Sequence, residues 1–566
     1  MTWRRPIPTV GDRTSAAQRA AAPDAWAFDP ATIDALHTVI AARRDIRRFR
    51  PDPVPDDLVR SVLDAGHRAP SVGHSQPWRF ITVRAATTRD RAAHIADRER
   101  LRQAEQLEPD RRQRLLDLQL EGIREAPIGV VVACDRRTPA AGVLGRATFA
   151  DTDVWSCACA IENIWLAARA AGLGVGWVTL FPPAELADLV GLPSGVETLG
   201  WLCLGWPDER PPDPGLERNG WSRRMPLDDV IIAERWPADG GAPAAPPSFL
   251  AAPSGAAIVA ARDSGDDLLT APGSLGVLDA TVNRVLALSG ETPTAGTLVV
   301  IAADHPVTRH AVSAYPTSVT AEVLDATRCG ESLGAVAARR AGLRVVAERA
   351  TPLLPQGDLL ETDALDIADV DSLVSTGRRL GREAATRGLV CLGEIGIGNT
   401  TVAAALVCAL LEASPQKTVG LGVNADAAML DRKRAVVDGA LTRARAHYGS
   451  RLAKPRTALA ALGGPEFAML TGVVLGAAAE GAPVVLDGLA TSVAALLAVG
   501  MEPGARAALV AGQHSREQAH QLVLTELGLE PLLDLRFRAG EGVAACLAAQ
   551  LLLSALSIRQ ETGRVT

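Results

Sequence analysis

The sequence predicts an α/β protein with two domains of similar size. Residues 236–257 form a stretch rich in Pro, Ala, Gly and Ser without an apolar period, as is typical of a linker. The two sides of this stretch differ in composition, because all ten tryptophans lie at or before Trp236. Short apolar runs of strand length alternate with helical patterns on both sides. We therefore expect domains at 29–235 and 258–566, joined by the linker at 236–257 and preceded by a mobile segment at 1–28.

Composition and charge exclude several classes of protein. The chain has 48% hydrophobic and 22% charged residues, enough for two buried cores, and its net charge of -7 argues against nucleic-acid or membrane-surface binding. The eight cysteines lack zinc-site spacing, so we expect no metal and free thiols in a reducing compartment. The N-terminus has no apolar signal core, and the most apolar region, 467–500, is interrupted by charged residues, Gly and Pro. We expect a cytoplasmic protein without a membrane-spanning helix.

The first domain opens with a predicted helix at 32–42 that leads into an arginine cluster. Arg43 and Arg47 are four residues apart, so we expect them on one helical face, where their guanidinium groups would suit a phosphate. A solvated basic helix end is the simpler alternative. Asp45 lies among these arginines, and their charge is expected to favour its ionised form.

A turn rich in Gly and Pro at 69–77 precedes a predicted strand at 79–83. The backbone at Ser71 and Gly73 can approach a flat ligand closely. Residues 86–125 have a charged helical pattern, which fits either a solvated helix or a lid. Further strands are predicted at 128–134, 174–179 and 199–205, and a helix is predicted to begin at 151 and end at the Ala-Gly pair 171–172.

Four motifs of this domain together resemble one family. They are R-R-D-I-R at 43–47, A-P-S-V-G-H-S-Q-P-W at 69–78, L-E-G-I-R-E-A-P at 120–127 and G-L-G-V-G-W-V at 172–178. In this order they resemble the oxygen-dependent 5,6-dimethylbenzimidazole synthases, a flavin-consuming branch of the nitroreductase fold. An ordinary nitroreductase usually has Ser where this chain has Asp45, and this difference indicates that flavin is the substrate rather than the catalyst.

The resemblance implies an α+β nitroreductase-like flavoprotein fold and a reaction of reduced FMN with molecular oxygen. Asp45 would take part in proton transfers while the flavin ring is cut. Thr179 stands where the family has a catalytic serine, so the hydroxyl is kept and a methyl group is added. The residues that would hold reduced FMN and its phosphate, or line the flavin, are Arg43, Arg44, Arg47, Ser71 and Gly73.

The second domain begins with a predicted helix at 278–288 and an apolar strand at 297–302 that ends at Asp304 and His305. An acid and a histidine at the carboxyl end of a strand suggest a site in an α/β domain. Its strongest feature is the strand, glycine loop and helix at 389–411, which contains Glu394. The helix start suits an anion, yet the glycine spacing fits neither a Walker loop nor a dinucleotide fingerprint. A nucleoside monophosphate is the ligand that this loop favours.

Two later segments add carboxylates. A predicted strand at 484–486 ends in Asp487 and Gly488, before another helix. Glu541 lies between two glycines just before an apolar helix at 545–558. It is placed to face a cleft, although a simple helix-start charge is the alternative.

Six motifs resemble the nicotinate-nucleotide–dimethylbenzimidazole phosphoribosyltransferases over about residues 258–560. They are A-A-D-H at 302–305, S-A-Y-P at 313–316, G-E-I-G-I-G-N-T-T at 393–401, A-L-G-G-P-E at 461–466, V-V-L-D-G at 484–488 and L-G-L-E-P-L-L-D-L at 527–535. The resemblance implies a parallel, Rossmann-like sheet. It makes Glu541 the general base, assisted by Glu394. The residues that would border the base or hold the phosphate are Ser313, Tyr315, Gly396, Gly398, Asn399, Thr400 and Lys433.

Three departures from this family pattern lie near the expected nucleotide. Leu421 to Asn424 replace R-G-T-G, Val543 and Ala544 replace the last two residues of G-E-G-T-G, and Pro306 replaces a glycine after His305. Both carboxylates, Glu394 and Glu541, are kept. We expect a working site, with reduced activity or an altered nucleotide preference.

The two resemblances fit together, because the product of the first domain is the acceptor of the second. We expect a bifunctional enzyme for the lower ligand of cobamides, with nicotinate mononucleotide and 5,6-dimethylbenzimidazole as substrates, a separate reductase supplying reduced FMN, and a homodimer or larger assembly. One alternative is an FMN oxidoreductase that recycles its flavin. The other is a second domain that binds a base or nucleotide without catalysis.

Overall fold

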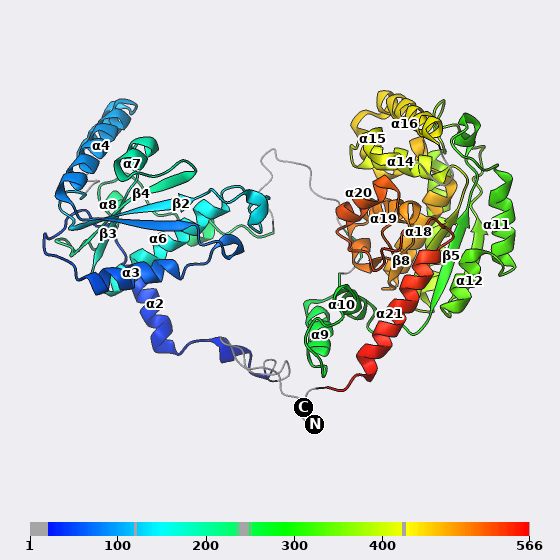
Figure 1. Ribbon diagram of the computed structural model, residues 1–566, viewed down its shortest axis with the longest axis horizontal. Helices are drawn as coiled ribbons and strands as arrows, with labels where there is room; N and C mark the ends of the chain where they lie inside the picture. The colour runs from blue at the N-terminus through cyan, green and yellow to red at the C-terminus, as the bar shows by residue number, and fades with distance from the viewer. Residues whose placement is uncertain are drawn as a thin grey trace. The chain divides into compact units, whose positions relative to one another are not determined.

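The computed structural model describes residues 21–117, 122–234, 248–250, 252–420 and 426–564, together with Gln18 and Trp236. The chain divides into two compact units, one at Asp24–Gly241 and the other containing Ala242–Thr566 (Figure 1). The division falls within the predicted linker at 236–257. Most of the predicted N-terminal segment 1–28 lies outside the described residues. The first unit is the one before this division, and the second unit is the one after it.

The first unit is built on a four-stranded antiparallel sheet with the order β1-β2-β4-β3. The central strand β2 is almost wholly buried, and its side chains alternate between two cores as strand geometry requires. Val130 and Val132 pack with α3 and α6, whereas Val131 packs with α4 and α7. The strands are β1 (Trp78–Val83), β2 (Ile128–Asp135), β3 (Gly174–Val178) and β4 (Val196–Gly205). The α-helices are α2 (Pro30–Ala42), α3 (Asp56–His67), α4 (Ala86–Glu105), α5 (Pro109–Asp117), α6 (Thr152–Ala170), α7 (Pro183–Val190) and α8 (Gly215–Arg218).

The helix α2 is correctly predicted but ends before the arginine cluster. Its N-terminus is capped by Asp29, whose carboxylate accepts from two backbone N–H groups, and its C-cap Arg43 has extended backbone. Ile46 N donates to Val175 O (3.0 Å), so the segment 43–49 runs beside β3 instead of continuing the helix. The prediction that Arg43 and Arg47 share a helical face is therefore wrong. Pairing with a neighbouring strand overrides the local pattern here.

The second unit is built on a five-stranded parallel sheet with the order β6-β5-β7-β8-β9. Helices cover both faces, and strand side chains alternate between them: Val299 and Ile301 face one core, Leu298 and Val300 the other. The strands are β5 (Gly296–Ala302), β6 (Arg344–Arg349), β7 (Leu389–Ile395), β8 (Val484–Leu486) and β9 (Leu509–Ala511). The α-helices are α9 (Gly255–Asp266), α10 (Val277–Ser289), α11 (Ser318–Arg328), α12 (Leu333–Arg340), α13 (Ile367–Ala385), α14 (Asn399–Leu410), α15 (Pro415–Thr418), α16 (Ala427–Tyr448), α17 (Pro455–Leu462), α18 (Pro465–Ala479), α19 (Leu489–Met501), α20 (Gln518–Leu527) and α21 (Val543–Glu561).

The strand order fixes where a ligand site can form. The chain runs from β5 outward to β6 and then returns past β5 to β7, so the order reverses between β5 and β7. Open parallel sheets bind ligands at the carboxyl ends of the strands beside such a reversal. Asp304 and His305 follow β5, and Glu394 lies at the end of β7, with Ile301 as its partner across the two strands. The fold-class prediction of a parallel α/β sheet is confirmed.

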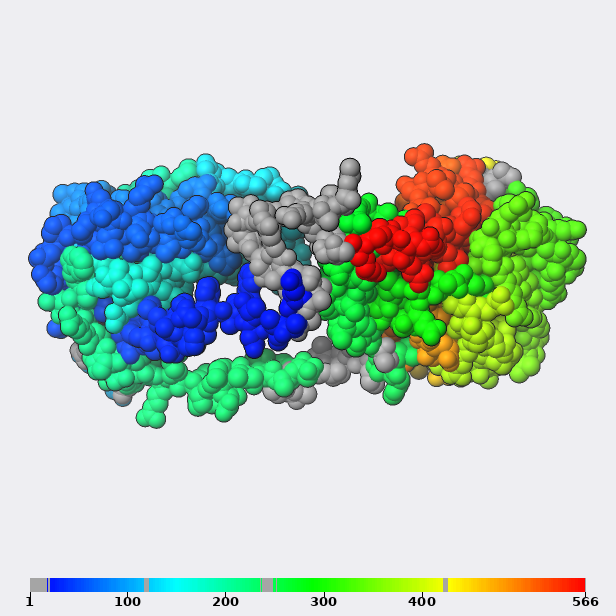
Figure 2. Space-filling view, turned by 90° about the horizontal axis from the view of Figure 1, so that it is seen from below, coloured from blue at the N-terminus to red at the C-terminus, as the bar shows by residue number. Residues whose placement is uncertain are grey.

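The helix α21 is the one described helix with the length and hydropathy that a membrane span needs. More than half of its most apolar window is buried within the second unit. Its buried face packs against β7, α10 and α12 in one of the two cores. The end of α21, drawn in red, emerges at the surface between other segments of its own unit (Figure 2). Its apolar character is that of a helix packed into a protein core.

Candidate active sites

One cleft of the first unit has a volume of about 990 Å³ and lies where the arginine cluster meets the segment 209–224. Seven arginines and four carboxylates line it, so its charge favours an anionic ligand. The arginines are Arg43, Arg44, Arg47, Arg48, Arg218, Arg223 and Arg224. The extended backbone of 43–48 thus brings these side chains together without a helix.

The four arginines of the cluster have different surroundings. Arg43 stacks over the Trp165 ring, 4.6 Å from its centroid. Arg44 donates to the carbonyls of Ala41 (2.7 Å) and Pro212 (2.5 Å), so its guanidinium holds backbone on two sides of the cleft. The backbone N–H groups of Arg47 and Arg48 both donate to Oε1 of Glu209, at 2.7 and 3.1 Å. Glu209 therefore fixes the backbone from which Arg47 and Arg48 project, a role that the sequence did not suggest.

Asp45 lies beside Arg47, with which it forms an ion pair, and its Oδ1 accepts from Trp177 N at 3.2 Å. Its side chain is 41% exposed and lines the arginine-rich cleft. The pKa of Asp45 is raised, because loss of water around the carboxylate outweighs the attraction of Arg47. The arginines favour the ionised form of Asp45 as expected, but burial of the carboxylate outweighs their effect on its pKa.

Thr179 lies in a second cavity of about 390 Å³. Trp177, Trp221 and several aliphatic side chains line this cavity, which makes it largely apolar. Arg47 lines both cavities, and Asp45 lines the first of them while Thr179 lines the second. Ser71 and Gly73 line neither cavity. In the described part of one chain, the arginines therefore line the cleft, whereas Ser71 and Gly73 do not line either cavity.

The site of the second unit is organised around Glu541. Its backbone is left-handed (φ 63°), as is that of Gly542 (φ 80°), and Glu541 N donates to Glu394 O at 3.2 Å. Its Oε2 accepts from Gly334 N (3.1 Å) in the first turn of α12, where the helix dipole favours a negative charge. A non-glycine residue in this backbone region is often found at functional sites.

Glu394 shares this site with Asp487. Asn399 donates to the carboxylate of Glu394, and Asp487 Oδ1 accepts from Ala544 N (2.8 Å) and Ala545 N (3.1 Å) at the start of α21. Burial, reinforced by the nearby carboxylates of Asp487, Glu466 and Glu541, raises the pKa of Glu394 from 4.5 to about 8. Burial likewise raises the pKa of Asp487 from 3.8 to about 7. Glu394 is therefore mostly protonated at neutral pH.

The glycine loop between β7 and α14 contains Gly396 and Gly398, followed by Asn399 and Thr400. Gly398 has left-handed backbone (φ 96°) and begins the helix. Lys433 is buried on α16 and its Nζ donates to Thr400 Oγ1 at 3.3 Å, so a cation lies at the helix start. Burial lowers the pKa of Lys433, whereas Glu517 acts in the opposite direction. This arrangement fits a phosphate group.

Two further features border this region. His305 Nε2 lies 2.8 Å from Glu466 Oε1, and both side chains are buried under the glycine loop, since a Cβ on Gly396 would lie 3.1 Å from His305 Nε2. Ser313 Oγ accepts from Tyr315 N at 3.2 Å, which shapes the loop before α11, and Tyr315 is 40% exposed. The replaced segment 421–424 lies outside the described residues.

Comparisons with known proteins match the two units separately. The model of a phosphoribosyltransferase family matches residues 250–566, and that of the nitroreductase family matches residues 40–206. A 5,6-dimethylbenzimidazole synthase of Rhodospirillum rubrum is 43% identical over 201 residues, which are 35% of this chain and 94% of that protein. A nicotinate-nucleotide–dimethylbenzimidazole phosphoribosyltransferase of Chloroflexus aurantiacus is 38% identical over 317 residues, which are 52% of this chain and 89% of that protein.

The chain belongs to both families. The phosphoribosyltransferase family covers its second unit and the nitroreductase family its first. A solved nicotinate-nucleotide–dimethylbenzimidazole phosphoribosyltransferase from Thermus thermophilus is 34% identical, with a TM-score of 0.51 over 55% of this chain and 99% of that one. The predicted fusion of two families is confirmed.

Sequence reasoning missed three residues of the phosphoribosyltransferase unit. Asp487 was noticed only as part of a strand-turn motif, yet it caps the helix that follows Glu541. Glu466 and Glu517 face His305 and Lys433 across the fold, and no local pattern links such distant positions. Of these three residues, only Asp487 has a sequence signal for a site, because it is a carboxylate next to a glycine at the end of a buried strand.

Proposed function

We propose that the chain is a bifunctional enzyme for the lower ligand of cobamides. The nitroreductase-family unit would convert reduced FMN and molecular oxygen into 5,6-dimethylbenzimidazole. The phosphoribosyltransferase unit would then transfer the phosphoribosyl group of nicotinate mononucleotide to that base, giving α-ribazole 5'-phosphate and nicotinate. One observation carries the proposal: the relative of the first unit is named for making the base that the relative of the second unit is named for using.

In the first unit, we propose that the arginine-rich cleft holds the phosphate and ribityl chain of reduced FMN. Arg43 and Arg47 would contact the phosphate, whereas Arg44 and Glu209 would hold the backbone of the cleft through the bonds given above. Asp45, whose pKa is raised by burial, lies beside Arg47 in this cleft and is the group that we propose gives and takes a proton. Thr179 would contribute a hydroxyl from the adjoining apolar cavity.

In the second unit, we propose that Glu541 accepts the proton of the benzimidazole nitrogen while that nitrogen attacks the ribose. The N-terminus of α12 places a backbone donor and the positive end of the helix dipole beside this carboxylate. Glu394, mostly protonated at neutral pH, would act as a hydrogen-bond donor. Lys433, Thr400 and the glycine loop would hold the phosphate, and Ser313 and Tyr315 would border the benzimidazole ring.

Two copies of the chain are part of the proposal. Ser71 and Gly73 line neither cavity of their own unit, so we propose that they reach the flavin of a second copy. The apolar face of α2 supports this, because Ile33, Leu36 and Ile40 are 39–55% exposed. A separate flavin reductase, a cytoplasmic location and the absence of a metal remain predictions.

Separate assays of the two halves test the proposed function. Under air, reduced FMN should disappear and 5,6-dimethylbenzimidazole should appear by mass spectrometry. With added 5,6-dimethylbenzimidazole, nicotinate mononucleotide should release nicotinate. Turnover driven by NAD(P)H without loss of flavin would instead make the first unit an oxidoreductase. Tight binding of the base without release of nicotinate would make the second unit a binding module.

A further inference from the structure

The turn at 71–76 has a backbone that needs outside support. Gly73, His74 and Gln76 all have left-handed backbone, with φ of 52°, 52° and 46°. A histidine and a glutamine adopt this region rarely, and they stay there only where the surrounding structure holds them. The conformation of this turn therefore depends on its contacts with the rest of the unit.

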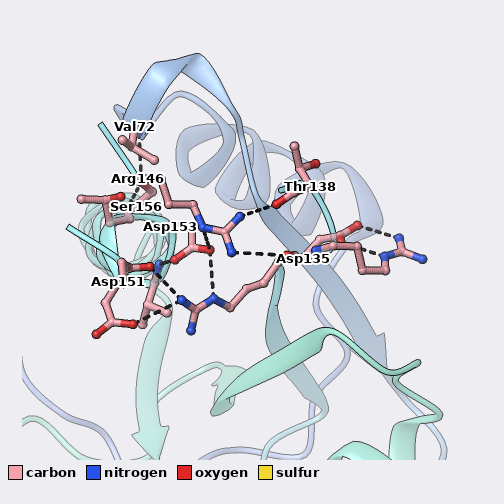
Figure 3. Close-up of polar contacts among 12 residues, drawn as sticks. Val72, Asp135, Thr138, Arg146, Asp151, Asp153 and Ser156 are labelled. Carbon is pink, nitrogen blue, oxygen red and sulfur yellow. Dashed lines mark hydrogen bonds and ion pairs between the residues drawn. The ribbon is translucent and has the colours of Figure 1, made fainter. Parts of the chain in front are cut away.

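The first support is a serine of α6. Ser156 is 5% exposed, and its Oγ accepts from Val72 N at 3.1 Å while it donates to Thr152 O at 2.6 Å (Figure 3). One hydroxyl thus ties the turn to the helix that packs against β2 and α3. The hydroxyl therefore holds the backbone of the turn at Val72, the residue immediately before Gly73.

The second support is the segment 137–150, which lies directly against the turn. A Cβ on Gly73 would lie 2.9 Å from Leu144 N, and one on Gly145 would lie 3.3 Å from Val72 Cγ2. The backbones of Gly73 and Leu144 are thus packed too closely for a side chain at Gly73, so a shift of Leu144 towards the turn would displace it. The position of the 71–76 turn therefore depends on the position of segment 137–150.

A buried ionic cluster fixes that segment. Asp153 is 2% exposed, and its Oδ2 lies 3.0 Å from Arg136 Nε and 3.1 Å from Arg146 Nε. The same two arginines donate to the segment's backbone: Arg146 to Thr138 O and Arg136 to Ala150 O, both at 2.7 Å. Figure 3 shows the guanidinium group of Arg146 pointing towards Asp153 and Thr138. The cluster thus holds the two ends of the segment.

We propose that Ser156 and the cluster of Asp153, Arg136 and Arg146 are positioning residues that hold the 71–76 turn where Ser71 and Gly73 meet the flavin. This inference rests on the proposed function of the first unit. The four side chains line neither of the two cavities, so they act through the turn. Their effect should appear in the fate of the flavin, because a displaced turn would leave reduced FMN to be oxidised by oxygen to FMN and hydrogen peroxide without being cut.

The test is Ser156→Ala in the full chain. Amide hydrogen exchange of the 71–76 turn should become about fivefold faster, the factor that corresponds to one net hydrogen bond. The share of consumed reduced FMN that becomes 5,6-dimethylbenzimidazole should fall by a similar factor. The matched control is Ser289→Ala, which removes an equivalent bond to the carbonyl four residues earlier (Val285 O, 2.7 Å) in α10 of the second unit. It should change neither measurement.

Arg146→Lys provides a second variant that keeps a cation beside Asp153 but loses the two guanidinium donors to Thr138 O and Arg136 O. It should raise exchange in both the 137–150 segment and the turn. Unchanged exchange of the turn in both variants would overturn the proposal, as would uniformly faster exchange across the unit or an unchanged product share. If wild-type chain makes no 5,6-dimethylbenzimidazole, the proposed function fails, while the exchange measurement still decides whether these residues hold the turn.

Discussion

Glu541 and Glu394 are two carboxyl groups of one site with different surroundings. The N-H of Gly334 at a helix start faces Glu541, whereas Glu394 is buried among other carboxylates. Such a division suits a reaction that needs one group to accept a proton and another to stay neutral. We therefore expect different effects from replacing Glu541 and from replacing Glu394.

Glu541→Gln should lower the release of nicotinate by about 10²–10⁴-fold, the range expected when a general base is lost. The amide keeps the shape of the side chain but cannot take the proton. Steady-state assays with added 5,6-dimethylbenzimidazole measure this loss, and production of the base by the first unit should not change. The control Glu526→Gln alters an exposed carboxylate on α20. Comparable activity in Glu541→Gln and this control would remove Glu541 from catalysis.

Glu394→Gln should change how stability depends on pH. The folded chain holds the Glu394 proton more tightly than the unfolded chain, so this group favours folding below pH 4.5 and loses that contribution as pH rises towards about 8. Each pKa unit corresponds to about 1.4 kcal/mol, and neighbouring carboxylates share the effect. Thermal unfolding at pH 5.5 and 8.5 should show a smaller loss of stability for Glu394→Gln than for wild type. An equal loss in both proteins would contradict the burial argument.

At the scale of elements, close packing of backbone positions Glu541. A Cβ on Gly334 would lie 2.3 Å from Glu541 O, and one on Gly393 would lie 2.7 Å from Glu541 C. The start of α12 and the end of β7 thus hold the Glu541 backbone between them. The geometry of the site therefore depends on Gly334 and Gly393, which have no side chain that could take part in the reaction.

Gly334→Ala should lower phosphoribosyl transfer by about 10- to 100-fold, because a displacement of a catalytic group by about 1 Å can cost that much. Thermal unfolding of the second unit reports on whether the variant is otherwise intact, because the first unit has a separate core. Gly255→Ala is the matched control, since it lies at the start of α9 with open space around its Cβ. Full transfer activity in Gly334→Ala would show that the backbone contact does not position Glu541.

Regular elements could be predicted from the sequence far better than the site contacts. The buried strand at 128–134 and the strand, loop and helix at 389–411 have strong apolar patterns and appear as expected. The course of 43–49 could not be predicted, because it depends on β3: a Cβ on Gly176 would lie 2.3 Å from Ile46 O. The raised pKa of Asp45 likewise could not be predicted, because it follows from burial of the carboxylate in the folded chain.

At the scale of the whole molecule, the chain joins two units with separate cores and separate sites. A fused chain raises the local concentration of an intermediate that one site makes and the other uses. This gain in local concentration relies on diffusion of the intermediate from one site to the other and requires no contact between the units. The base should then also pass between different chains.

A mixture of Asp45→Asn and Glu541→Gln chains should therefore make α-ribazole 5'-phosphate much faster than either variant does alone. The Glu541→Gln chain would supply the base and the Asp45→Asn chain would use it. Formation should be slower than in wild type at low protein concentration and should approach it as protein concentration rises. Mass spectrometry over a dilution series measures this, and a mixture that stays inactive at every concentration would argue against exchange of free base.

We propose that one chain converts flavin into the base of its own second product. The most direct measurement is mass spectrometry of a single aerobic reaction with this protein, reduced FMN labelled with ¹³C in its dimethylbenzene ring, and unlabelled nicotinate mononucleotide. We predict α-ribazole 5'-phosphate that carries the ring label, together with one nicotinate for each molecule formed. Labelled FMN recovered intact, with no labelled base or nucleotide, would contradict the account.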